Sequence, residues 1–129
     1  MTLQEIKRYD ISNITSRSVK IRQKELGKTK NAVLIKKTKD SFYFQSPHTF
    51  NKKDNYSITI KKDKKDVKFH CSCESFSKQG FQYRSTKTGC ALFVEKRKDA
   101  RWSRFHGDAL LCKHLYLLIN SNVIKKLGI

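Results

Sequence analysis

Two pairs of potential metal ligands stand out in the sequence, each with a single residue between its members. Residues 69–76 read FHCSCESF and contain Cys71 and Cys73, and residues 111–119 read LCKHLYLLI and contain Cys112 and His114. Three thiolates and one imidazole make a closed tetrahedral set of the kind that holds a structural zinc ion. Such soft ligands favour zinc over magnesium, calcium or manganese, with an iron–sulfur cluster as the less favoured alternative. The pattern therefore predicts one bound Zn²⁺.

The same spacing constrains the backbone that presents these ligands. Side chains two residues apart point the same way on a strand, but they lie about 200° apart on a helix of 3.6 residues per turn. Cys71 and Cys73 are therefore expected at the end of a strand. Cys112 and His114 both reach one ion only if Cys112 lies at the entry of a helix and His114 lies in its first turn. We accordingly expect the C-terminal helix to begin near Cys112.

The segments before and after these ligands predict an α+β fold. Residues 32–37, 41–46, 56–61 and 66–71 are short, rich in β-branched and aromatic residues, and separated by polar turn clusters. They are expected to form a small antiparallel β-sheet. From about residue 109 apolar residues recur at helical spacing, with a kink expected at residues 120–122 and Gly128 at the position of a terminating glycine.

Other segments carry shorter patterns. Residues 3–8 suggest a short helix, residues 17–23 (RSVKIRQ) alternate like a strand, and residues 90–96 with 101–105 suggest a small hairpin. No Pro- or Gly-rich linker interrupts the 129 residues, so a single domain is expected. Within it, residues 1–40 would be an N-terminal extension, residues 41–129 the zinc-binding region, and residues 74–111 an insert between the two ligand pairs.

The chain is strongly basic, with 29 Lys and Arg against 11 Asp and Glu and a net charge of +18. The excess is present in both halves, and a basic surface over a whole domain is typical of a nucleic-acid binder. A Lys-rich surface with no polyanionic partner is the simpler alternative. Self-repulsion at this charge works against compaction, which is a second reason to expect a metal ion to stabilise the fold.

The sequence gives no sign of a membrane partner or of secretion. Its longest apolar run, residues 115–119, is too short to cross a bilayer, and no secretory signal is visible. We expect an intracellular, reducing compartment, either cytoplasm or nucleus, and that of a host cell if the protein is viral. In such a compartment four cysteines favour metal binding or free thiols over disulfides.

The ligand motifs resemble the SWIM-type zinc finger, Cys-x-Cys…Cys-x-His, found in some helicase-like ATPases, transposases and many small viral or bacterial proteins. CSCESF is similar to the family's Cys-x-Cys-x-x-Phe, CKHLYLL to its Cys-Lys-His and apolar helix, and SP…YSITI to its preceding strand. The resemblance covers residues 44–76 and 109–120 and implies a β-hairpin and a helix that clasp one zinc ion. Residues 1–40 have no counterpart. The insert is longer than in compact members, which leaves Cys90, His70 and His106 open as replacement ligands.

The insert interleaves basic and aromatic residues in FQYRSTK (81–87) and EKRKDARWSRFHG (95–107). Cations neutralise phosphates while aromatic rings stack on exposed bases, an arrangement suited to single strands or distorted duplex. The alternative is that the aromatic residues anchor the insert to the rest of the domain. The candidate nucleic-acid contacts are Arg84, Lys87, Arg97, Arg101, Trp102 and Arg104.

Three functions compete. The first is a zinc-stabilised nucleic-acid-binding module, with DNA favoured over RNA. The second is a protein-interaction module or an accessory subunit of a larger nucleic-acid-handling complex, because SWIM-type fingers are also linked to partner binding. The third, an enzyme such as a hydrolase using Cys90 and His106, is disfavoured. The sequence shows no paired carboxylates, nucleophile elbow or phosphate-binding glycine loop, and its 11 acidic residues offer little for a two-metal site.

Overall fold

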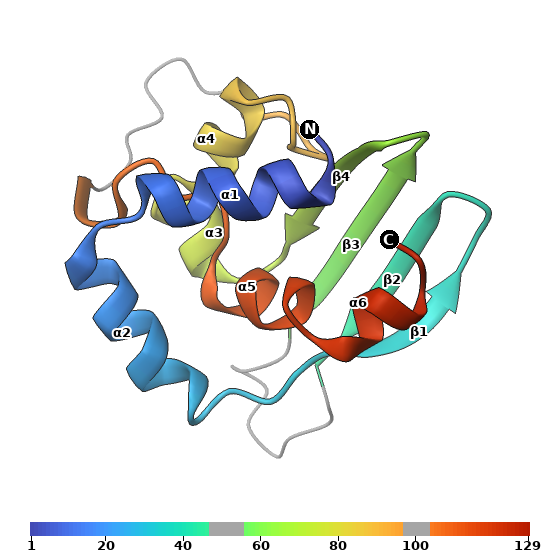
Figure 1. Cartoon of the computed structure of the whole chain (residues 1–129), viewed down its shortest axis with the longest axis horizontal. Helices are drawn as coiled ribbons and strands as arrows, with labels where there is room; N and C mark the ends of the chain where they lie inside the picture. The colour runs from blue at the N-terminus through green and yellow to red at the C-terminus, as the bar shows by residue number, and fades with distance from the viewer. Residues whose placement is uncertain (47–55, 97–103) are drawn as a thin grey trace.

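An antiparallel sheet forms the centre of the structure, a computed structural model that describes residues 1–46, 56–96 and 104–129. Its strands lie side by side in chain order, each antiparallel to the next. They are β1 (Val33–Lys37), β2 (Ser41–Gln45), β3 (Ser57–Asp63) and β4 (Asp66–Cys71). All four coincide with segments predicted from the sequence. With the helices that pack on it, this sheet makes a small α+β fold (Figure 1), as predicted.

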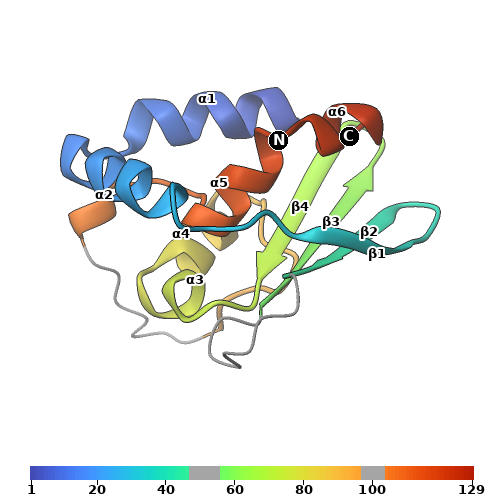
Figure 2. The same cartoon turned by 90° about the horizontal axis from the view of Figure 1, so that it is seen from below.

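The register of the sheet turns its apolar side chains to one face. Ile60 lies opposite Phe42 on one side and Phe69 on the other, and Ile58 lies opposite Phe44. All five are buried. Figures 1 and 2 show the N-terminal helix, in blue, and the C-terminal helices, in red, on one side of the sheet. The buried cluster continues into these helices through Leu3, Ile6, Leu115, Leu118, Ile119 and Ile124, and into the segment before the C-terminal helices through Leu110 and Leu111.

The helices of the described residues come from three parts of the chain. They are α1 (Leu3–Asn13), α2 (Ser16–Leu26), α3 (Glu74–Lys78), α4 (Phe81–Lys87), the 3₁₀ helix η2 (Arg104–His106), α5 (Lys113–Ile119) and α6 (Asn122–Lys126). The helix predicted at residues 3–8 is the first part of α1. The predicted C-terminal helix is present as α5 and α6, which are separated at Asn120 and Ser121, inside the predicted kink. Gly128 follows α6 with a φ of +73°, a conformation that suits glycine.

Residues 17–23 are helical, so the predicted strand there is wrong. Thr15 caps α2 by accepting a hydrogen bond from the Ser18 backbone N–H at 3.1 Å. The side chains that α2 buries are polar, Ser18 and Arg22, which lie one helical turn apart. Ile21, in contrast, is 38% exposed. The buried face of α2 is therefore polar. A prediction from the alternation of apolar residues cannot identify this face, and it assigned the segment to a strand.

The described part of the insert contains two short α-helices and one 3₁₀ helix. Helices α3 and α4 span five and seven residues, so neither is long enough to show a clear hydrophobic period in the sequence. Among the described residues of the predicted hairpin, Ala91 alone makes a β-bridge, a parallel one to Phe69 of β4. Residues 97–103 lie outside the described residues, but Arg104 and Phe105 belong to the 3₁₀ helix η2, so the described part does not form the predicted hairpin.

Residues 109–111 form a buried, irregular segment that leads into α5, and the N-terminal helices satisfy its backbone. Asp10 of α1 accepts hydrogen bonds from the backbone N–H groups of Leu110 and Leu111 through Oδ1, at 2.9 and 3.0 Å. Its Oδ2 accepts from Arg22 Nη1 at 2.9 Å, and Arg22 Nη2 donates to the carbonyl of Leu111 at 2.6 Å. Both charged side chains are buried. Residues 1–40 therefore help to position the chain immediately before Cys112.

The insert holds the same segment from the other side. Arg84 of α4 donates from Nε to the carbonyl of Ala109 at 2.7 Å and from Nη1 to the carbonyl of Gln79 at 3.2 Å. Gly107 lies against the α1–α2 connection, where an added Cβ would come within 2.4 Å of the Asn13 carbonyl oxygen. Its φ of +61° also favours glycine. The N-terminal helices and the insert therefore meet around residues 107–111.

Replacing Asp10 with alanine is expected to destabilise the protein strongly. The change leaves Arg22 buried without its anion and leaves two buried N–H groups without an acceptor. We expect the free energy of unfolding, measured by urea denaturation, to fall by about 3–5 kcal/mol. The control is Asp66→Ala, which removes an exposed carboxylate 3.2 Å from the N-terminal amino group and should cost less than about 1 kcal/mol. Equal losses in the two variants would contradict this role of Asp10.

Candidate metal centre

The first ligand pair spans the junction between β4 and α3. Cys71 is the last residue of β4 and lies opposite Ile58, so its side chain is on the buried face of the sheet. Cys73 is the N-cap of α3, with an extended backbone of φ −68° and ψ 153°. The strand predicted to deliver this pair therefore ends at its first cysteine, and a helix begins directly after the second.

The second ligand pair lies at the start of α5. Cys112 is the N-cap of this helix, with φ −65° and ψ 168°, and His114 is its second residue. This confirms the prediction that the helix begins near Cys112. Neither Cys73 nor Cys112 makes a side-chain capping hydrogen bond to its helix. The amide groups at these helix starts favour negative charge on the two nearby sulfurs.

The four side chains converge into one group, which we call the Cys3His cluster (Cys71, Cys73, Cys112 and His114). Their ligand atoms all lie within 4.8 Å of one another, and Cys71 Sγ is 3.8 Å from His114 Nδ1. Around a tetrahedral zinc ion, bonds of about 2.3 Å to sulfur and 2.0–2.1 Å to nitrogen place the ligand atoms roughly 3.5–3.8 Å apart. The cluster is close to this size and has a suitable set of donors, so it could hold a metal ion.

The three sulfurs of the cluster are close enough to control one another's protonation. Burial raises the pKa of Cys112, and the neighbouring Cys71 and Cys73 raise it further. Hydrogen bonds from Cys112 and then from Cys71 lower the pKa of Cys73. By themselves the sulfurs therefore favour one thiolate held by two thiols, because three thiolates would repel one another. A divalent cation would stabilise all three, and its binding would release protons.

Tyr56 packs directly on the cluster, a role that its position in the sequence does not reveal. Its ring stacks on the ring of His114, with centroids 3.8 Å apart and an interplanar angle of 24°. The Tyr56 hydroxyl donates a hydrogen bond to the carbonyl of Lys30 at 2.8 Å. Burial and the nearby cluster sulfurs raise the pKa of Tyr56 to about 12, so it stays neutral at physiological pH. Tyr56 thus fixes the orientation of the imidazole, as groups around metal ligands commonly do.

Two of the alternative ligands have other surroundings. Cys90 is buried, and its Sγ donates a weak hydrogen bond to the carbonyl of Thr88 at 3.7 Å. His70 precedes Cys71 in β4, so its side chain lies on the opposite face of the sheet. Its ring contacts the rings of Phe76 and Phe93 at centroid distances of 5.3 and 4.8 Å. Neither belongs to the metal-ligand group found among the described residues.

His106, the third alternative, connects the N-terminal helices to the insert. Its Nδ1 lies 2.6 Å from Ser18 Oγ of α2, and its Nε2 lies 2.7 Å from Gln79 Oε1, directly after α3. Burial lowers the pKa of His106, and the charges of Arg84 and Arg22 lower it further. A neutral ring satisfies both partners, because Nε2–H donates to the amide oxygen while Nδ1 accepts from the hydroxyl. His106 is therefore part of the packing between elements, and it does not join the Cys3His cluster.

The candidate nucleic-acid contacts are only partly described, and one of them needs correction. Arg84 is 4% exposed and donates to backbone carbonyls, so it is a structural residue and we remove it from the candidate contacts. Lys87 is exposed on α4, with its Nζ 4.9 Å from the centre of the Tyr83 ring. Arg97, Arg101 and Trp102 lie outside the described residues, as does the side chain of Arg104 at the start of η2.

Comparison of the chain with protein-family models, curated proteins and solved structures finds no match. The likeness to the SWIM-type finger is therefore carried by the motif residues alone. Among the described residues, no helix has both the length and the apolar character needed to cross a membrane.

Acidification is expected to destabilise the protein through His106. Because the pKa of His106 is lowered in the folded state from its usual value near 6.5, the unfolded chain takes up this proton first as pH falls. The stability contributed by the neutral ring is therefore fully present above about pH 7, and it is lost progressively as pH falls from about 6.5 through the lower pKa of the folded state.

The variant His106→Asn should show a smaller loss of stability than the wild type between about pH 7 and pH 5. The measurement is urea denaturation of both proteins at a series of pH values and one fixed zinc concentration. Identical pH dependence in the two proteins would contradict the assignment to His106.

Proposed function

We propose that this chain is a zinc-stabilised nucleic-acid-binding module, with DNA as its expected ligand. The observation that carries the proposal is the convergence of the Cys3His cluster within a chain of net charge +18. Three sulfurs and one imidazole suit zinc among the common divalent cations. Because the protein supplies four ligands, no coordination position is left for water or substrate, which is typical of a structural zinc ion.

Zinc in this cluster would tie together segments that are distant in the sequence. The cluster joins the end of β4 and the start of α3 to the start of α5, so it closes the insert of residues 74–111 at both ends. A hairpin, β3–β4, followed by a helix, α5, is the arrangement that the resemblance to SWIM-type fingers implies. Metal binding to such a site contributes directly to the free energy of folding.

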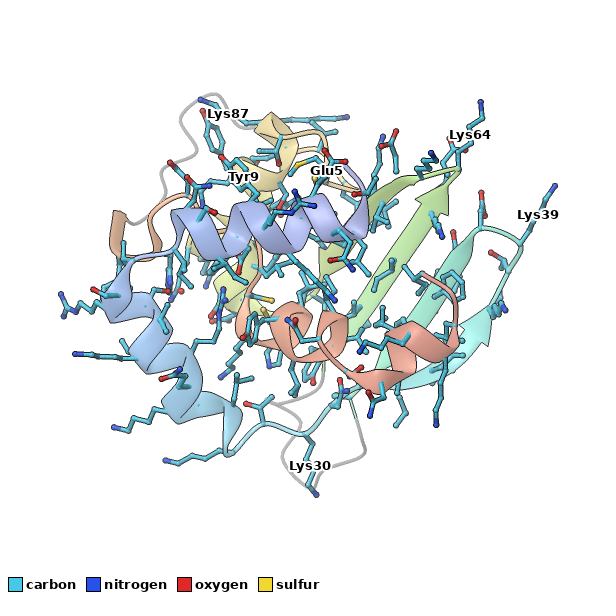
Figure 3. All side chains as sticks on the ribbon, in the orientation of Figure 1. Glu5, Tyr9, Lys30, Lys39, Lys64 and Lys87 are labelled. Carbon is cyan, nitrogen blue, oxygen red and sulfur yellow. The ribbon has the colours of Figure 1, made fainter. Side chains whose placement is uncertain are left out.

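The distribution of charge supports a polyanionic partner. The 11 carboxylates of the chain cannot neutralise its 29 lysines and arginines. In Figure 3, Lys30, Lys39, Lys64 and Lys87 extend into solvent from different parts of the fold. Lys39 and Lys64 stand at the tips of the β1–β2 and β3–β4 hairpins. Positive charge on several sides favours contact with phosphates irrespective of nucleotide sequence.

The exposed edge of the sheet favours a second candidate function, protein interaction. In the described part of the chain, β1 pairs with β2 alone and so forms an edge of the sheet. It exposes Val33, Leu34 and Ile35, at 53%, 38% and 58% of their surface. An edge strand with apolar side chains can accept a strand from another protein through backbone hydrogen bonds. Binding to a partner of this kind would depend little on salt concentration.

Removal of the metal is expected to unfold the protein. Elemental analysis of protein purified under reducing conditions should find one zinc per chain, and titration with a chelator should abolish the folded circular-dichroism spectrum. Cys112→Ser should have the same effect without a chelator. The matched control is Cys90→Ser, which changes a buried cysteine outside the cluster and should keep the metal content. A spectrum unchanged by the chelator would rule out a metal-dependent fold.

Affinity for nucleic acid is expected to fall steeply with salt. The logarithm of the binding constant should decrease linearly with the logarithm of salt concentration, with a slope of about −0.9 per phosphate contacted on duplex or about −0.7 on single strands. Fluorescence anisotropy with labelled duplex DNA, single-stranded DNA and RNA measures this slope. A flat response, together with salt-resistant binding to a protein, would favour the second candidate function.

A further inference from the structure

The face of the sheet away from the helices carries cations and aromatic groups. Cross-strand pairing and the alternation of side chains place one set of residues on this side, which we call the outer face. Its principal members are Lys36, Tyr43, Thr59, Lys61, Lys68 and His70. The apolar neighbours of these residues along β2, β3 and β4 point to the opposite, buried face of the sheet, which lies toward the N-terminal and C-terminal helices (Figure 2).

One row of the outer face crosses all four strands. Lys36 of β1 lies opposite Tyr43 of β2, Tyr43 lies opposite Thr59 of β3, and Thr59 lies opposite His70 of β4. Lys36 Nζ is 5.7 Å from the centre of the Tyr43 ring. Beyond β4, the ring of Phe93 contacts the ring of His70 at a centroid distance of 4.8 Å and is 57% exposed. The row therefore carries exposed or partly exposed aromatic rings at two separate points, Tyr43 on β2 and Phe93 beyond β4.

A neighbouring row holds two cations side by side. Lys61 of β3 lies directly opposite Lys68 of β4, and like charges in such a pair destabilise a sheet. Neither of them, nor Lys36, forms an ion pair within the described residues. Asp63 and Asp66 end this face at the β3–β4 turn, where Asp66 already pairs with the N-terminal amino group. An anion bound across the middle of the outer face would relieve the repulsion between the lysines.

We propose that the outer face is a binding platform for a single-stranded polynucleotide. Lys36, Lys61 and Lys68 neutralise its phosphates, and Tyr43 and Phe93 stack on its bases. Aromatic rings beside cations are the means by which proteins bind single strands, because unpaired bases expose the faces that a duplex keeps stacked inside. The inference rests on the proposed nucleic-acid function. It differs from the sequence-based prediction in placing the main contacts on the sheet instead of the insert, and it specifies that the nucleic acid is single-stranded.

The test measures fluorescence anisotropy of labelled oligothymidylate and oligouridylate of roughly 12 nucleotides, a length typical of single-strand sites. An abasic oligomer of equal length and a DNA duplex serve as comparison ligands. Tyr43→Ala should weaken binding to the base-containing single strands about 5-fold or more and leave binding to the abasic oligomer unchanged. Tyr43→Phe keeps the ring and should bind like the wild type.

The charge variant is K61Q/K68Q, which should weaken binding to every single strand, abasic oligomer included, and reduce the salt slope by about 1.4. Its matched control is K20Q/K24Q, which removes two exposed lysines from α2 and should leave the slope unchanged. Thermal melts confirm that each variant is folded. The relative affinities for thymidylate and uridylate then show whether the platform prefers DNA or RNA.

The outcomes separate the two proposals. If the wild type binds none of the oligomers at low salt, the nucleic-acid function fails and the platform with it. If the wild type binds but K61Q/K68Q and K20Q/K24Q weaken binding equally and Tyr43→Ala has no effect, the outer face is not the site, and the nucleic-acid function stands. Preference for duplex over single strands, with Tyr43→Ala again without effect, would also overturn the platform.

Discussion

The buried segment at residues 109–111 sets the main constraint on this structure. It belongs to no helix or strand, so its backbone polar groups need partners from elsewhere, because buried N–H and C=O groups without hydrogen bonds are costly. Asp10 and Arg22 supply partners from the N-terminal helices, and Arg84 supplies one from the insert. Three charged side chains are thereby buried in a protein of modest size. Their contacts fix the path of the chain into α5.

The Cys3His cluster lies next to this segment in the chain. The geometry of the cluster depends on the path of residues 109–111. Cys112 is the residue that follows the segment, and His114 lies within the first turn of α5. On the other side, Cys71 is held by the pairing of β4 with β3, and Tyr56 supports the imidazole ring. Both halves of the cluster are thus positioned by contacts that involve no metal. A metal ion would add its binding energy to these contacts, and without it the net positive charge of the chain opposes compaction.

Much of this architecture could be predicted because the relevant signals are local. Short runs rich in β-branched and aromatic residues marked the four strands, and the one-residue gap in Cys112-x-His114 excluded both positions from the middle of a helix. The same signals failed where the buried residues are polar. In α2 the inward-facing side chains are Ser18 and Arg22, so the apolar alternation pointed to a strand. The prediction that Arg84 contacts nucleic acid was wrong for the same reason. An arginine is usually exposed, and only the tertiary structure shows that Arg84 is buried and donates to backbone carbonyls.

By itself the sequence determined the types and spacing of the candidate metal ligands, the strands that precede them and the excess of positive charge, because these depend on composition and on short-range periodicity. Only the tertiary structure decided that residues 1–26 support the ligand site, that Cys90 and His106 lie apart from it, and that Lys61 and Lys68 share one face with Tyr43. Each of these depends on register or on side-chain pairing between residues far apart in the chain. Such pairing is set by the burial and hydrogen bonding of the whole fold, so no local pattern encodes it.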